Sequence, residues 1–173
     1  TYGVIFEADA RLVVPNPPDD WAAYSCTLAY YAYRASFDPK CHSSVRLCLE
    51  EAVERFPSYA SAWALLSLTY IDDVRFRYPF DPIQSPTLID RALAAADRAL
   101  ELEPLNTRGL QAQMLALYFK REIGAAMRVG RRAMSINPND TVLTGEYGYR
   151  LALSGNWDDG CPLVAEALRR NPG

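Results

Sequence analysis

The sequence predicts an all-α protein, a right-handed α-α superhelix (a solenoid) of about four helix pairs. One observation is a fixed period, because Pro104, Pro138 and Pro172 follow one another at intervals of 34 residues. Another is that apolar and small residues recur within each period at the spacing of one helical face. A period of roughly 20 to 50 residues is typical of repeat proteins, in which each unit stacks on its neighbours.

The N-terminal segment, residues 1–18, shows no repeat. Residues 1–12 contain apolar residues and a glycine, and we interpret them as a helix left from an upstream domain or linker. The run Asn16-Pro17-Pro18 then breaks the chain. Because residue 1 is Thr, we expect the chain to be a processed product or an excised segment of a longer protein.

The repeat domain is expected over residues 19–173, beginning with a degenerate unit at about 19–57. Asp19 or Asp20 caps a first helix that runs to about residue 36. A loop over 39–43 leads to a second helix over 43–56. The second helix fits the repeat pattern, whereas the first has no clean register.

The second unit, at about 60–104, contains an insertion. Its helices are expected over 60–73 and 87–103, and the first carries Trp63, Leu66, Ser67 and Tyr70 on one face. Pro57 precedes Pro104 by 47 residues, 13 more than the period, so we place the insertion at 74–86.

The third and fourth units, at about 107–138 and 141–172, keep the period. Helices are expected over 107–121, 123–136, 141–154 and 157–170. The second helix of each unit carries a face of small residues, which lets paired helices approach closely. In units two to four the face consists of Ala92, Ala96 and Ala99, then Ala126, Gly130 and Ala133, then Gly160, Val164 and Ala167.

The period and the face that begins at Trp63 resemble the tetratricopeptide repeat (TPR). Segments 24–57, 70–78, 91–96 and 137–140 are also similar to the repeat tail of certain bacterial regulators. In those regulators the tail follows a TolB-like module behind a nucleotide-cyclase or winged-helix domain, and residues 2–6 resemble the end of that module. This resemblance implies a sensory or scaffold region without catalysis of its own.

Composition and motifs argue against several functions. The net charge of −3 argues against nucleic-acid binding, and no apolar run approaches the roughly 20 residues needed for membrane insertion. Carboxylate pairs such as Asp72-Asp73 point apart on a helix, no glycine-rich phosphate loop is present, and His42 is the single histidine. We therefore predict that the chain is not an enzyme and needs no cofactor.

The four cysteines could supply zinc ligands together with His42, but their spacing matches no paired-ligand motif. They are Cys26, Cys41, Cys48 and Cys161. We interpret them as free structural thiols and predict no metal site. The lack of a secreted-type cysteine framework favours a reducing compartment, so we expect a cytoplasmic protein.

A concave groove lined by the first helix of each pair is the candidate binding surface. Its expected composition, apolar and aromatic with a few polar groups, is typical of a peptide or helix site. For each aromatic residue in the groove, packing against a neighbouring unit is as much expected as contact with a partner. The groove residues expected to contact a partner are Leu68, Gln111, Leu115, Tyr118, Phe119, Glu146 and Tyr149.

The insertion is a second candidate surface, because it contains Arg75, Phe76, Arg77 and Tyr78, residue types enriched at binding hot spots. The alternative is that its aromatics, Phe80 included, fold back on the solenoid as a plug. We favour the plug, because aromatics left in water would promote aggregation.

The predicted function is that of a protein-interaction module of a larger bacterial signalling protein, which binds a peptide or helix in the groove. The alternative is a small-molecule sensor that regulates an attached cyclase or DNA-binding domain. The chain ends where a unit ends, and its last helix presents Trp157, Val164 and Leu168 without a polar cap. We expect the native protein to continue, and a second copy to cover this end of the segment as a homodimer.

Overall fold

The structure, a computed structural model, describes residues 21–78 and 85–172. Within these ranges the chain forms eight α-helices and no strand, which confirms the predicted all-α solenoid of four helix pairs. Predictions for residues 1–18 and for Phe80 lie outside the described residues. The helices are α2 (Trp21–Ser36), α3 (Pro39–Arg55), α4 (Ala60–Phe76), α5 (Ser85–Leu102), α6 (Thr107–Phe119), α7 (Ile123–Ile136), α8 (Thr141–Leu153) and α9 (Trp157–Arg170).

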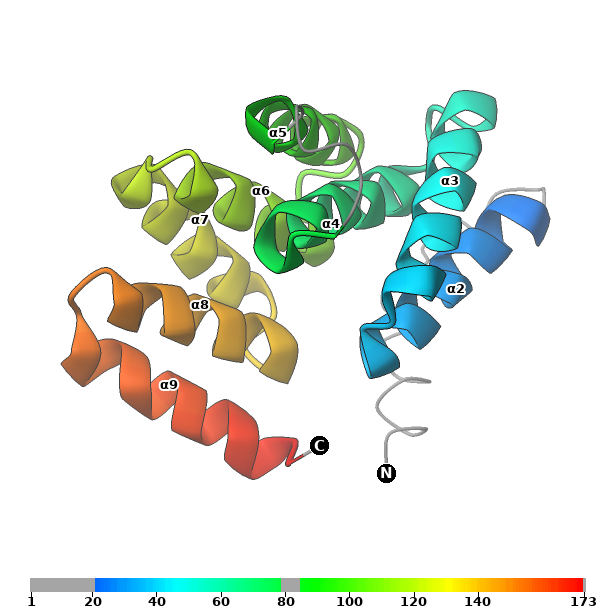
Figure 1. The fold of residues 1–173 in the computed structure, drawn as a ribbon. Helices are drawn as coiled ribbons and strands as arrows, with labels where there is room; N and C mark the ends of the chain where they lie inside the picture. The colour runs from blue at the N-terminus through cyan, green and yellow to red at the C-terminus, as the bar shows by residue number, and fades with distance from the viewer. Residues whose placement is uncertain (1–20, 79–84, 173) are drawn as a thin grey trace.

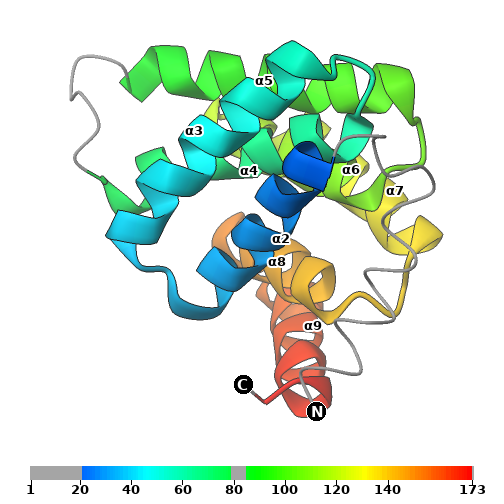
Figure 2. The ribbon, with the colours of Figure 1, turned by 90° about the vertical axis from the view of Figure 1, so that its right-hand side faces the viewer.

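The helix pairs follow one another along the solenoid (Figure 1), from α2 and α3 at one end to α8 and α9 at the other. The second helix of each pair packs on the first helix of the next, so α3 contacts α4, α5 contacts α6 and α7 contacts α8. Helix α9 extends below the other helices (Figure 2). In the described part of the chain, no helix is both long and apolar enough to cross a membrane.

Helix α3 begins four residues earlier than expected. Pro39 occupies its first turn, where the missing proline N–H costs nothing, and the Asp38 carboxylate accepts a hydrogen bond from the Lys40 N–H at 2.9 Å. The predicted loop over 39–43 is therefore wrong. Asn106 and Asp140 cap α6 and α8 in the same way, one period apart, by accepting from the N–H groups of Gly109 and Leu143.

The insertion is partly helical. Helix α4 continues to Phe76, three residues beyond its expected end, and Arg77 follows it in the left-handed conformation with φ of 51°. Helix α5 already begins at Ser85. The described ends of the insertion are thus the last turn of α4 and the first turn of α5.

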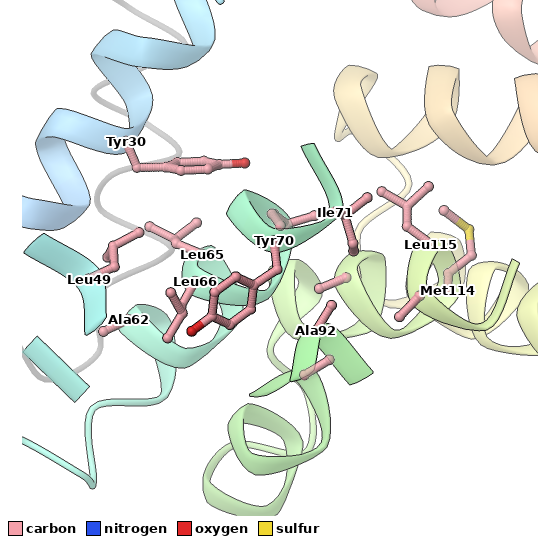
Figure 3. Packing of buried hydrophobic residues seen from close by; sticks show 14 of the residues in the cluster. Tyr30, Leu49, Ala62, Leu65, Leu66, Tyr70, Ile71, Ala92, Met114 and Leu115 are labelled. Carbon is pink, nitrogen blue, oxygen red and sulfur yellow. The ribbon is translucent and has the colours of Figure 1, made fainter. Parts of the chain in front are cut away.

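The core runs along the axis of the solenoid. Tyr30 of α2, Leu49 of α3 and Leu65 of α4 are at most 3% exposed at one end (Figure 3), and Met114 and Leu115 of α6 continue the cluster. Burying a side chain of this size contributes about 1.5–3 kcal/mol, so the stability of each pair depends on its neighbours.

Helices α8 and α9 cross at two glycines. A Cβ atom on Gly160 would lie 2.5 Å from the backbone nitrogen of Ala152 and 2.6 Å from the carbonyl oxygen of Gly148. A Cβ atom on Gly148 would lie 2.8 Å from the carbonyl oxygen of Gly160. Backbone atoms cannot move aside as a flexible side chain can, so both positions require glycine.

The substitution Gly160→Ala should destabilise the protein by about 1–3 kcal/mol, because the added methyl group forces α8 and α9 apart. Gly124→Ala in α7 is the matched control, since its Cβ would meet only the Arg128 guanidinium at 3.6 Å, and it should gain up to about 1 kcal/mol. Urea unfolding measures both, and equal effects of the two substitutions would contradict the close crossing.

Candidate partner-binding surface

Three of the predicted groove residues belong to the core. Leu68, Gln111 and Leu115 are only 2–4% exposed, and Gln111 accepts a hydrogen bond from Arg108 at 2.7 Å. These three side chains contact other parts of the chain, so the prediction that they contact a partner needs correction. The helical spacing placed them on the groove side of α4 and α6, but that part of the groove is filled.

Helix α2 packs against α4. Its Tyr30 ring points toward α4 (Figure 3), and the Tyr33 hydroxyl donates to Asp72 Oδ2 at 3.1 Å. The Arg34 guanidinium pairs with the same carboxylate at 3.2 Å. Burial raises the pKa of Asp72, while the Arg34 charge and the Tyr33 hydrogen bond oppose the shift. These contacts hold α2 against α4.

An arginine surrounded by aromatic rings lies where the third and fourth units meet. The Arg150 guanidinium is 5.2 Å from the Tyr118 ring, 5.5 Å from the Phe119 ring and 5.1 Å from the Tyr149 ring. A cation over an aromatic face is attracted by the ring quadrupole. Tyr118 and Phe119 are half-buried, and Tyr149 is 46% exposed. Three predicted groove residues thus converge on one buried cation that sequence reasoning did not select.

Glu146 joins the groove to the insertion. Its carboxylate accepts a hydrogen bond from Arg75 at 2.6 Å and lies 3.3 Å from Arg150. Burial lowers the pKa of the Arg150 guanidinium, the Glu146 charge opposes this, and the Arg75 charge adds to it. The two candidate surfaces therefore meet at the Arg75–Glu146 pair.

A pocket of about 290 Å³ opens beside this pair, between α8 and α9. Its apolar wall includes the exposed side chains of Val142, Tyr149 and Leu168. Its lining consists of Arg75, Thr141, Val142, Gly145, Glu146, Tyr149, Val164, Ala167, Leu168 and Asn171. An apolar wall with one charged pair at its edge can bury an apolar side chain and orient it by a polar contact.

The described aromatics of the insertion fold back on the first unit. The Tyr78 hydroxyl donates to the carbonyl oxygen of Phe37 at 2.9 Å, and its ring lies 4.6 Å from that of His42. The Phe76 ring lies 5.3 Å from that of Phe37. Phe76 and Tyr78 therefore act as part of a plug, whereas Arg77 is exposed and Arg75 faces the pocket.

A buried polar network connects α3 to α4. Fully buried His42 makes a 3.1 Å hydrogen bond with the Thr69 carbonyl oxygen, and its Nδ1 lies 3.5 Å from Asp73 Oδ1. Arg46 donates to Asp73 Oδ2 at 3.0 Å. Burial raises the pKa of the Asp73 carboxyl, which the His42 and Arg46 charges oppose. The adjacent residues Asp72 and Asp73 on α4, together with Arg46 on the preceding helix α3, are a signal in the sequence. It was not used in the sequence analysis.

Cys26 and Cys48 form a disulfide that links α2 to α3, with their Cα atoms 5.5 Å apart. The prediction that both are free thiols is wrong, because the antiparallel packing of the two helices brings together residues that are 22 positions apart. Cys41 and Cys161 are free and exposed. Since disulfides persist mainly in oxidising compartments, a cytoplasmic location stays a prediction. No group of three or more metal-ligand residues gathers in the described ranges.

The fold is similar to that of solved TPR proteins. TTC0263, a thermophilic TPR protein of Thermus thermophilus, matches with a TM-score of 0.64 and 18% identity, over 99% of this chain and 89% of that one. MamA matches with a TM-score of 0.53 and 17% identity, over 99% of this chain and 85% of that one. These matches show a TPR-like solenoid fold.

No protein-family model matches the chain. No curated protein matches its sequence. The TolB-like module and the cyclase or winged-helix context that we inferred from the resemblance find no support in the structural matches.

Removing the Asp73 carboxylate should destabilise the protein by about 3–5 kcal/mol, because Asp73→Ala leaves Arg46 and His42 buried without their shared partner. The control is Glu51→Ala, which breaks an exposed pair with Arg55 and should cost at most about 1 kcal/mol. Chemical unfolding measures both. A small loss for Asp73→Ala would mean that the network contributes little to the joint between the first two units.

Proposed function

We propose that the chain is a protein-interaction module that binds a peptide or helix of a partner on the concave side of its fourth unit. The observation that carries the proposal is the pocket between α8 and α9, where exposed Tyr149, Val142 and Leu168 surround an accessible apolar space. Half-buried aromatics and arginine at the edge of such a space are the residues that dominate binding energy at protein interfaces. Tyr118, Phe119, Glu146, Tyr149 and Arg75 therefore remain the candidate partner contacts.

A scaffold role also agrees with the burial of the histidine. The single histidine, His42, is fully buried and lies between Asp73 and the Thr69 carbonyl oxygen. A general base must reach the proton that it removes, and no substrate can reach this ring without unfolding the first unit. We accordingly propose a non-catalytic function.

The small-molecule sensor is the weaker of the two functions that the sequence suggested. Small-molecule sites usually enclose about 300–1,000 Å³ and bury most of the ligand. The pocket here, at about 290 Å³, lies just below that range and runs along two helices. A pocket of this volume and shape fits a side chain that projects from a larger partner better than an enclosed small molecule. The resemblance to regulator tails supports a place for such a module beside a signalling domain.

The proposal predicts that helical peptides selected from a displayed random library will bind through the fourth unit. The double substitution Tyr118→Ala with Tyr149→Ala should lower the affinity for the selected peptides at least tenfold, because burying one aromatic side chain contributes about 1.5–3 kcal/mol. Fluorescence anisotropy measures the affinity, and Leu47→Ala, at a 59% exposed site on α3, is the control.

Two results would count against this function. A library that yields no specific binder would contradict a peptide-binding role. Selected peptides that bind the double variant and the control equally well would place the binding surface elsewhere. A melting curve for the double variant close to that of the unsubstituted chain is needed, because unfolding would show that Tyr118 or Tyr149 belongs to the core.

A further inference from the structure

We propose that the face formed by α8 and α9 binds an amphipathic helix of a partner protein, in the position that α8 itself occupies on α6 and α7. The inference rests on the proposed function and deepens it. The partner segment is assigned a helical structure, and two of its side chains are assigned positions on the α8–α9 face.

The pocket lining follows the 34-residue period of the sequence. Arg75 aside, moving the pocket lining back by 34 residues gives positions on α6, on α7 and directly after α7, which form the face of the third unit that meets the fourth. Ala167 corresponds to Ala133, Leu168 to Met134 and Val164 to Gly130. The pocket is therefore the fourth-unit copy of a surface that the chain already uses.

In the third unit this surface is covered by α8. Leu143, in the first turn of α8, is fully buried in one cluster with Ala133, and Met134 packs against that cluster. One turn later Tyr147 lies over Gly130, where a Cβ atom would come within 2.4 Å of the tyrosine ring. Leu143 and Tyr147, four residues apart, are thus two of the side chains by which α8 covers the third unit.

The second unit is covered in the same way by α6. Gly109 corresponds to Leu143, and a Cβ atom on it would lie 3.1 Å from Leu100 and 3.4 Å from Ala99. Leu100 and Ala99 are the second-unit counterparts of Met134 and Ala133. This surface therefore receives the first turn of a helix in two successive units.

In the fourth unit the same surface is accessible. Leu168 is 62% exposed and Val164 is half-buried, whereas their third-unit counterparts Met134 and Gly130 are half-buried and buried. Continuity with the two internal interfaces indicates a helix as the occupant, lying along α9 with its N-terminal turn near Leu168.

Two differences between the units restrict the sequence of the partner helix. Val164 replaces Gly130, so the space that admits the Tyr147 ring in the third unit is partly occupied, and the partner needs a small residue there. Val142 replaces Arg108, which pairs with the Asp140 cap of α8 at 2.9 Å. The partner thus presents leucine in its first turn and a small residue four positions later, and needs no acidic cap.

The test uses a synthetic peptide of residues 140–155 that carries Tyr147→Ala, with blocked ends and a fluorophore. Fluorescence anisotropy should show saturable binding to the chain, and Leu168→Glu in the chain should weaken it by about tenfold or more. Leu47→Glu, an equally exposed leucine on α3, should leave the affinity unchanged. The peptide with Tyr147 retained should bind more weakly, because its ring meets Val164.

A second measurement avoids the low helicity of a short free peptide. Repeating residues 140–154 with Tyr147→Ala directly after Gly173 places the added helix in register. The midpoint of thermal unfolding should rise, and Leu168→Glu should abolish the rise. The inference is overturned if the peptide does not bind and the added helix does not raise the midpoint of thermal unfolding.

Another occupant of the face would also overturn the inference. Sedimentation velocity of the chain alone should show a monomer at micromolar concentration. A dimer that Leu168→Glu dissociates would show that a second copy covers the face, as the sequence first suggested. If library-selected peptides bind at Tyr149 while the 140–155 peptide does not bind, this inference fails and the proposed function stands.

Discussion

The close crossing of paired helices is the constraint on which the rest of the structure depends. One position per period, occupied by Ala92, Ala126 and Gly160, is buried in the second, third and fourth units and sets how near the two helices can approach. At Gly160 the approach is so close that backbone atoms of α8 occupy the space of a Cβ. Because each pair packs in this way, the next pair meets a surface of the same shape, and the solenoid repeats.

The same repetition limits where a partner can bind. Tyr33 of α2 is buried and donates a hydrogen bond to Asp72 of α4, and Arg34 pairs with the same carboxylate, so α2 covers part of the second unit, whereas a pocket opens at the fourth. There, Arg75 from the end of α4 reaches Glu146 across 71 residues of sequence. The accessible surface thus combines a repeated helix face with one charged contact that the insertion contributes.

The sequence predicted the repeat correctly wherever the period holds, and the bounds of α7 and α9 agree with the structure at both ends. Several of its errors lie where contacts do not repeat, although Gln111 and Leu115, which are also buried, belong to the regular third unit. The Cys26–Cys48 disulfide, the helical start of α3 at Pro39 and the burial of Leu68 all belong to the degenerate first unit or to its contact with α4. Arg150 escaped notice because its role depends on aromatic rings from two units, which helical spacing within one unit cannot bring together.

Amide hydrogen exchange, followed by mass spectrometry with and without a saturating helical peptide, tests most directly whether the fourth unit is the binding surface. Exchange reports the stability of hydrogen bonds helix by helix, and a ligand slows it where the ligand packs. We expect slower exchange in α8 and α9 and unchanged exchange in α3 and α5. Protection confined to α2 and α4, with none in α8 and α9, would contradict it.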